Sequence, residues 1–260
     1  MDGGVVVISA ALGLVVGWFL TRVIDRVPDR EALGGPSRCP ECRADLAVAD
    51  TIPIVSWFVL GGRCRACDEP IAVSTPVVEA GTAVLFAVAA LRFGASWVLV
   101  PFLVLFASLV AVTVIDLACY RIPDRIVFPT LGLALPLIVV VSLVVGIPEA
   151  IGPALVGSVV YFGLLFVPHL VYPKGMGFGD VKLALVLGLF LGWLGPSWLF
   201  AVQLVLLALV AGCVLGVVMG MGVLVVRGRR GAFPFGPALA LGTVVVVLFS
   251  NPILAAYGAG

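Results

Sequence analysis

Long apolar segments separated by short polar connections run along most of the chain. They cover about residues 4–24, 76–93, 97–117, 126–146, 151–172, 179–195, 197–226 and 235–256. An α-helix needs about 20 apolar residues to cross the ~30 Å hydrocarbon core of a bilayer, and most of these segments approach or exceed that length. The pattern predicts an all-α polytopic membrane protein with about eight transmembrane helices.

The amino-acid composition agrees with a membrane protein. Hydrophobic residues make up 62% of the 260 residues and charged residues only 11%, whereas soluble domains usually carry about 25% charged residues. The first apolar segment has no basic n-region before it and no A-x-A-like cleavage site. We therefore expect it to be a retained helix and not a secretory signal.

The basic residues predict how the helices are oriented. With the N-terminus outside the cytoplasm, fourteen of the fifteen Lys and Arg residues fall in cytoplasmic segments, and only Arg92 lies on the other side. This is the asymmetry of the positive-inside rule. We predict that both termini lie outside the cytoplasm, and that Lys174, Lys182 and the group Arg227, Arg229 and Arg230 lie on the cytoplasmic side.

One polar stretch is long enough to form a separate module. It divides the chain into a first transmembrane helix (1–24), a cytoplasmic module (25–75) and a transmembrane region (76–260). The module contains four cysteines in a C-x2-C-x21-C-x2-C pattern, namely Cys39, Cys42, Cys64 and Cys67. Two such pairs can place four thiolates tetrahedrally around Zn²⁺.

A metal would also supply folding energy, because a module of about fifty mostly polar residues cannot build a large core. We therefore interpret the four cysteines as a structural zinc site. Redox or disulfide chemistry and unligated thiols are the alternatives, and a cytoplasmic location argues against stable disulfides.

Four acidic residues lie near helix ends on the predicted cytoplasmic side: Glu79, Asp116, Asp124 and Asp180. Acids inside a membrane are rare and costly, and they usually have a function. Asp116 ends the third predicted helix and Asp180 opens the sixth, so the two occupy matching depths. Two facing carboxylates can act as an aspartyl dyad, in which one activates water and the other polarises a peptide carbonyl. For Asp180 alone, the alternative is a helix N-cap.

The residues around Asp180 predict an active-site loop. Gly175, Gly177 and Gly179 precede the acid, and glycines permit positive φ and close backbone approach by an extended substrate. Lys182 follows two residues after Asp180, about 200° around a helix, so we expect it to meet a lipid headgroup or an acidic substrate residue instead of Asp180.

These motifs resemble those of bacterial type IV prepilin peptidases, which are bifunctional leader peptidases and N-methyltransferases. The family is similar to other GxGD intramembrane aspartyl proteases. The resemblance covers most of the chain, in order, and rests on "GWFLTRVIDRVP", "RCPEC", "IPIVSWFVLGGRCRAC", "PIAVSTPVVE", "IDLACYRIPD", "GMGFGDVKLALVLG" and "FPFGPALALG".

The resemblance implies a role for each acid. Asp116 and Asp180 would be the catalytic pair, and Asp124 a structural acid that caps the next helix. Glu79 matches an acid that follows the second cysteine pair in the family, and we interpret it as a first-turn helix residue favoured by the helix dipole. The "FPFGP" turn is expected to break the chain before the last helix.

The resemblance further implies cleavage of prepilins or pseudopilins at the cytoplasmic face of the bacterial inner membrane. The new N-terminus would then be methylated with S-adenosylmethionine. The first motif departs from the family pattern G-S-F-L-N-V, because this chain has "GWFLTR" (Gly17–Arg22). A peptidase without methyltransferase activity is therefore an alternative. Membrane lipids are expected partners, and nucleic acid is not.

Two other functional classes would use similar residues. A proton-coupled transporter would also need intramembrane acids, but it predicts internal repeats, which are not evident in the sequence. A structural subunit of a secretion machine predicts that neither Asp116 nor Asp180 matters for activity.

Overall fold

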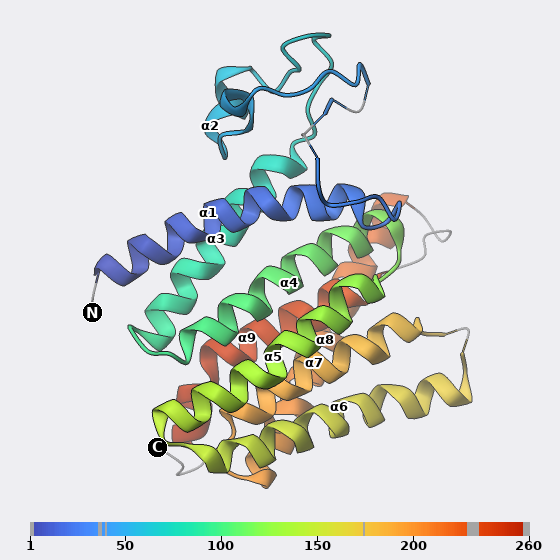
Figure 1. The fold of residues 1–260 in the computed structure, drawn as a ribbon. Helices are drawn as coiled ribbons and strands as arrows, with labels where there is room; N and C mark the ends of the chain where they lie inside the picture. The colour runs from blue at the N-terminus through green and yellow to red at the C-terminus, as the bar shows by residue number, and fades with distance from the viewer. Residues whose placement is uncertain (1–2, 36–37, 40, 174, 228–233, 257–260) are drawn as a thin grey trace. The chain divides into compact units, whose positions relative to one another are not determined.

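The computed structural model describes residues 3–35, 38–39, 41–173, 175–227 and 234–256. Helices form almost all of its regular structure (Figure 1). In chain order the helices are α1 (Gly3–Arg26), η1 (Val48–Thr51), α2 (Val55–Val59), α3 (Ser74–Phe93), α4 (Leu99–Cys119), α5 (Asp124–Val145), η2 (Pro148–Ala150), α6 (Ile151–Val171), α7 (Phe178–Leu194), α8 (Trp198–Arg227) and α9 (Gly236–Ala256). Within the described ranges the β-structure consists of two isolated bridges, so the all-α prediction is confirmed.

All eight predicted apolar segments are helical, and among the described residues six helices have the length and hydropathy of membrane spans. These six are α1, α3, α4, α5, α6 together with the preceding turn η2, and α8. Helix α7 is shorter, with 17 residues, and α9 is apolar over Gly236–Ser250. The protein is therefore a multi-pass membrane protein, and the crossing of the bilayer by α7 and α9 stays a prediction. Lys174, Arg229 and Arg230, used above to predict orientation, lie outside the described residues.

The chain forms two compact units, residues 1–99 and 100–260. In the first unit, α1 crosses α3 closely because two glycines of α1 face the α3 backbone. A Cβ on Gly13 would lie 2.6 Å from Ala83 Cα, and a Cβ on Gly17 would lie 2.7 Å from Glu79 Cα. Small residues at a crossing allow this approach between membrane helices. The cysteine module lies between these two helices in the sequence.

Helix α7 is the central helix of the second unit. Side chains are buried along nearly its whole length, from Asp180 to Trp193, as expected of a helix that is apolar on every side. Gly157 of α6 faces Gly188 and Gly192 of α7 at a backbone contact too close for a Cβ. The burial explains why a helix of only 17 residues is so hydrophobic, and it fixes α7 among its neighbours.

Aromatic and polar contacts join α7 to the helices that precede it. Phe102 of α4 packs on Phe190 and Trp193 of α7, with ring centroids 5.4 and 5.7 Å apart. Trp193 Nε1 donates a hydrogen bond of 2.9 Å to Ser142 Oγ of α5. These contacts hold α4, α5 and α7 in a defined register. Asp116 lies in α4 and Asp180 in α7, so this register positions the two acids.

Candidate functional site

The four cysteines of the module form one cluster. Their Sγ atoms all lie within 4.8 Å of one another, and the Sγ atoms of Cys39 and Cys67 are 3.7 Å apart. Tetrahedral zinc with Zn–S bonds of about 2.3 Å separates its sulfur ligands by about 3.8 Å. The predicted ligands Cys39, Cys42, Cys64 and Cys67 are thus brought together with the dimensions of a four-thiolate metal site.

Each cysteine pair lies in the same kind of backbone turn. In the first turn the Arg43 amide donates to the Cys39 carbonyl at 3.0 Å, and in the second the Asp68 amide donates to the Cys64 carbonyl at 2.9 Å. Arg43 and Asp68 both have positive φ, 56° and 60°, a conformation that costs free energy for residues with a Cβ. The repeated geometry shows that the two "CxxC" motifs fold as matching halves of the cluster.

The second turn also favours the charged form of its first cysteine. Backbone N–H groups of Ala66 and Cys67 donate to the Cys64 sulfur and lower the pKa of its thiol to about 7. A thiolate is the form that binds a metal ion. The backbone therefore prepares this sulfur for metal binding.

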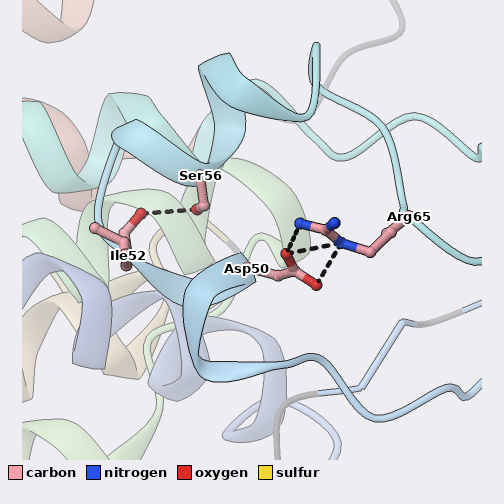
Figure 2. A network of polar contacts seen from close by, with 4 residues as sticks. All are labelled: Asp50, Ile52, Ser56 and Arg65. Atoms are coloured by element: carbon pink, nitrogen blue, oxygen red, sulfur yellow. Dashed lines mark hydrogen bonds and ion pairs between the residues drawn. The ribbon is translucent and has the colours of Figure 1, made fainter.

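Polar contacts fix the segment between the two turns (Figure 2). The Arg65 guanidinium donates to Asp50 Oδ1 from Nη2 at 2.6 Å and from Nε at 3.1 Å. The Asp50 side chain is only 5% exposed. Ser56 Oγ donates to the Ile52 carbonyl at 2.7 Å. The Arg65–Asp50 pair joins η1 to the second cysteine turn, so η1 and α2 are held close to the cluster.

Asp116 and Asp180 lie in one region of the second unit. Asp116 is in the last turn of α4, and Asp180 is the third residue of α7. The two residues are buried, at 5% and 7% exposure, and Ile122 lies against both Gly236, which contacts Asp116, and Gly179, which precedes Asp180. The two acids that the sequence singled out are therefore brought together.

A glycine and an isoleucine hold the two acids in place. The Gly236 amide, at the start of α9, donates to Asp116 Oδ2 at 3.1 Å. A Cβ on Gly236 would lie 2.7 Å from that oxygen and 3.0 Å from Ile122 Cδ1, and a Cβ on Gly179 would lie 2.8 Å from Ile122 Cβ. Ile122 lies in the connection between α4 and α5. Its side chain thus packs against the start of α9, next to Asp116, and against the start of α7, next to Asp180.

Sequence reasoning missed the roles of Gly236 and Ile122. Both residues occur inside motifs that were singled out, "FPFGP" and "RIPD", but nothing in a single sequence indicates which acid they contact. A glycine placed between Phe235 and Pro237 at the start of an apolar run was the available signal for Gly236.

The Asp180 carboxylate is only partly satisfied. Its Oδ1 atom is buried and has no hydrogen-bond partner among the described residues, and Oδ2 lies over the Gly177 backbone. Gly177, not Asp180, is the N-cap of α7, so the N-cap interpretation of Asp180 is wrong. A buried polar atom without a partner costs free energy, and Oδ1 is available to an incoming polar group.

Two of the three glycines before Asp180, Gly175 and Gly179, allow a close approach by a neighbouring side chain. Gly177 has φ −66° and Gly179 lies inside α7, so neither of these two uses the positive φ that glycine permits. Gly175 lies against the Tyr172 ring and Gly179 against Ile122, whereas a Cβ on Gly177 would meet Asp180 Oδ2 at an ordinary 3.4 Å. His169 Nδ1 lies 3.0 Å from the Met176 carbonyl, a further contact that fixes this loop.

Lys182 has a partner within the chain. Its Nζ donates to Asp124 Oδ1 and Oδ2 at 2.7 and 2.8 Å, and it lies over the rings of Phe128 and Phe178. Asp124 is the first residue of α5, whose N-cap is Pro123 without a side-chain cap. The expected capping role of Asp124 is therefore wrong, and the Asp124–Lys182 pair instead joins the start of α5 to the start of α7.

Glu79 is a buried acid within α3, not a first-turn residue. The helix begins at Ser74, and its first turn contains no acid, so the predicted start of this helix was too late. The Glu79 side chain is 3% exposed, and Oε2 accepts a 2.6 Å hydrogen bond from the Ile54 amide. Glu79 therefore ties the cysteine module to a membrane helix.

We expect the cysteine cluster to hold about one zinc ion per chain. Replacing Cys64 with Ser should remove most of the bound zinc, because it deletes one ligand of four. Cys119→Ser and Cys213→Ser are matched controls, since both thiols are exposed and lie outside the cluster. Elemental analysis of the purified protein checks this. The zinc site would be contradicted if the parental protein contained no zinc, or if Cys64→Ser contained as much zinc as the parental protein.

The Asp124–Lys182 pair should stabilise the second unit modestly. The side chains are 54% and 20% exposed, so we expect a coupling free energy of about 1 kcal/mol from a double-mutant cycle of Asp124→Asn and Lys182→Met. Thermal unfolding in detergent measures it. Arg125→Met, which alters the neighbouring exposed cation, should leave stability nearly unchanged, and strictly additive effects of the two substitutions would refute the pairing.

Two family models match the chain on either side of the boundary between its units. One, described as "Bacterial Peptidase A24 N-terminal domain", matches residues 11–93. The other, described as "Type IV leader peptidase family", matches residues 103–221. The first contains the cysteine cluster and Glu79, and the second contains Asp116 and Asp180. No solved structure matches the chain.

Curated relatives align with nearly the whole chain. A protein of Pseudomonas putida is 35% identical over 96% of this chain and 92% of its own length. A protein of Stutzerimonas stutzeri is 34% identical over 97% and 93%, and one of Neisseria gonorrhoeae is 32% identical over 95% and 91%. Each of the three is named "Prepilin leader peptidase/N-methyltransferase".

Proposed function

Because the chain belongs to the type IV leader peptidase family and is a peptidase, we propose that it removes the leader peptides of prepilin-like proteins with Asp116 and Asp180 as its catalytic pair. The observation that carries this proposal is the burial of these two carboxylates in one region, at the end of α4 and the start of α7.

Two neighbouring carboxylates can divide the chemistry of peptide hydrolysis between them. Like charges in one buried site favour a state in which one proton is held by the pair. The ionised acid takes a proton from a water molecule while the water oxygen bonds to the peptide carbonyl carbon, and the protonated acid donates to the carbonyl oxygen. The acid that took the water proton then gives it to the amide nitrogen, the other acid takes a proton back from a hydroxyl of the tetrahedral intermediate, and the C–N bond breaks to release the amine.

The surroundings of Asp180 suit it to the water-activating or carbonyl-polarising role. Its Oδ1 atom is buried without a partner among the described residues, which leaves it for a water molecule or a substrate carbonyl. Asp116 is more restrained, because the Gly236 amide already donates to its Oδ2. Gly175 and Gly179 pack against Tyr172 and Ile122, so Gly177 offers the less crowded backbone beside Asp180 along which an extended substrate segment would lie. Lys182 would support this loop through Asp124.

The proposed reaction takes place at the cytoplasmic face of the bacterial inner membrane. The distribution of basic residues in the sequence supports this orientation, with both termini on the opposite side. Asp116 comes after most of α4, and Asp180 comes at the start of α7, so both would lie near the same membrane surface. The substrates would be prepilins or pseudopilins, which carry a leader followed by a hydrophobic helix.

N-methylation with S-adenosylmethionine is a second candidate activity. The names of the relatives include it, and we propose that zinc in the cysteine cluster stabilises the module that this step requires. The motif "GWFLTR", which departs from the family pattern, has contacts within itself. The Arg22 guanidinium stacks 4.1 Å above the Trp18 ring, and Thr21 Oγ1 donates to the Trp18 carbonyl at 2.8 Å. Trp18 and Arg22, the unusual residues of this motif, therefore contact each other, and the neighbouring Gly17 packs on the Glu79 backbone.

Substitution of either acid should abolish cleavage. Asp116→Asn and Asp180→Asn are each expected to lose detectable processing of a prepilin in detergent, because neither Asn can complete the proton transfers. Glu149→Gln is the control, since Glu149 lies in η2, between α5 and α6, and outside the proposed site. The mass of the cleaved product shows whether its new N-terminus is methylated. Parental rates in either Asp variant would refute the catalytic pair and favour a structural or transport function.

A side chain at Gly236 should impair catalysis. In Gly236→Ala the added Cβ would lie 2.7 Å from Asp116 Oδ2, so the carboxylate must shift, and a shift approaching 1 Å costs about 100-fold in rate. We expect kcat to fall with little change in KM. Gly222→Ala in α8 is the matched control, because nothing lies within 4 Å of its added Cβ. Equal kcat values for the two variants would show that the Gly236 contact does not position Asp116.

A further inference from the structure

The short helix α2 has one face that packs on the cysteine module. The ring of Trp57 lies against Gly62, where an added Cβ would come within 2.9 Å of the ring. Trp57 Nε1 donates to the Ile71 carbonyl at 3.3 Å, and Ser56 is held by the Ile52 carbonyl (Figure 2). These contacts fix how α2 is rotated about its axis.

The other face of α2 is apolar and uncovered. Phe58 and Val59 are 68% and 75% exposed, and Val55 and Ile52 are also exposed. Four large apolar side chains on one short segment of a polar module are more than scattered surface hydrophobics. We call Ile52, which lies between η1 and α2, together with Val55, Phe58 and Val59 of α2, the α2 apolar face.

A hydrogen bond fixes the depth of this segment relative to the membrane. Helix α3 has 20 residues, or about 30 Å, which just matches the hydrocarbon core. Glu79 lies five residues inside the start of α3, roughly 7 Å along its axis. Side chains on a helix lean toward its N-terminus, so the carboxylate lies between that depth and the membrane surface. The Ile54 amide, 2.6 Å from Glu79 Oε2, therefore sits at the edge of the hydrocarbon core.

The neighbouring part of α3 also exposes apolar side chains. Val73 and Val77, around the start of this helix, are 62% and 61% exposed, as expected where a spanning helix meets lipid. The α2 apolar face and these valines thus lie near the same end of one membrane helix, and lipid is the apolar medium present there.

We propose that the α2 apolar face inserts into the lipid interface on the side of the cysteine module, so that the module is anchored to the bilayer surface by α2 as well as by α1 and α3. Glu79 sets the insertion depth through the Ile54 amide, and the Arg65–Asp50 pair connects the anchored segment to the second cysteine turn (Figure 2). This anchor does not depend on the proposed peptidase reaction.

Fluorescence quenching in vesicles tests the proposal with the full chain. An environment-sensitive fluorescent amino acid is incorporated at Phe58, and separately at Glu41, an exposed residue of the first cysteine turn. The vesicles contain phosphatidylcholine and phosphatidylglycerol, with a nitroxide-labelled phosphatidylcholine as the lipid quencher and iodide as the aqueous quencher. The expected result is several-fold stronger lipid quenching at position 58 than at position 41, and the reverse order for iodide.

Variants of Glu79 test the depth restraint. In Glu79→Ala the label at position 58 should lose part of its lipid quenching, whereas Glu79→Gln, which keeps an acceptor for the Ile54 amide, should retain it. Zinc content shows whether each module is folded. The proposal is overturned if iodide quenches positions 58 and 41 alike. It is also overturned if the label at position 58 becomes protected from iodide only when a prepilin is added, because the α2 apolar face would then bind a peptide. Protection from iodide only at a high density of protein in the vesicles would likewise overturn it, because the face would then bind a second copy of the chain.

Discussion

Two carboxylates buried at the ends of apolar helices are the constraint on which the second unit depends. Removing a charged group from water without compensation costs far more free energy than a domain can supply. Asp116 receives one backbone hydrogen bond, from Gly236, and one oxygen of Asp180 has no partner among the described residues. The packing of the surrounding helices must therefore hold a locally unfavourable site, as is common where strain serves a function.

That packing is organised around α7. Gly188 and Gly192 allow α6 to approach the α7 backbone, and Phe102 of α4 packs on its aromatic rings. The register of α4 against α7 sets the position of Asp116 relative to Asp180, and Ile122 and Gly236 close the remaining space. A helix that would be an ordinary membrane span by its composition thus becomes the rigid support for one of the two acids.

Much of this could be predicted from the sequence, because membrane helices leave strong signals. The lengths of the apolar segments predict the helices, and the spacing of the four cysteines predicts their cluster. The cost of placing a charge in a membrane marks Asp116 and Asp180 as functional residues. The partners of Asp124, Glu79 and Asp116 could not be predicted, because each lies far away in the sequence: Lys182, Ile54 and Gly236. The start of α3 was predicted two residues late, at residue 76, because Ser74 and Thr75 are polar although they are already helical.

Infrared difference spectroscopy of the carboxyl groups tests whether Asp116 and Asp180 share one proton, as we propose. Protein with ¹³C-labelled aspartate carboxyl groups is compared with the Asp116→Asn and Asp180→Asn variants at neutral pH. We expect a protonated carboxylic acid band in the parental protein that either substitution alters, because the proton belongs to both residues. A band that responds to only one of the two substitutions, or to neither, would contradict a shared proton.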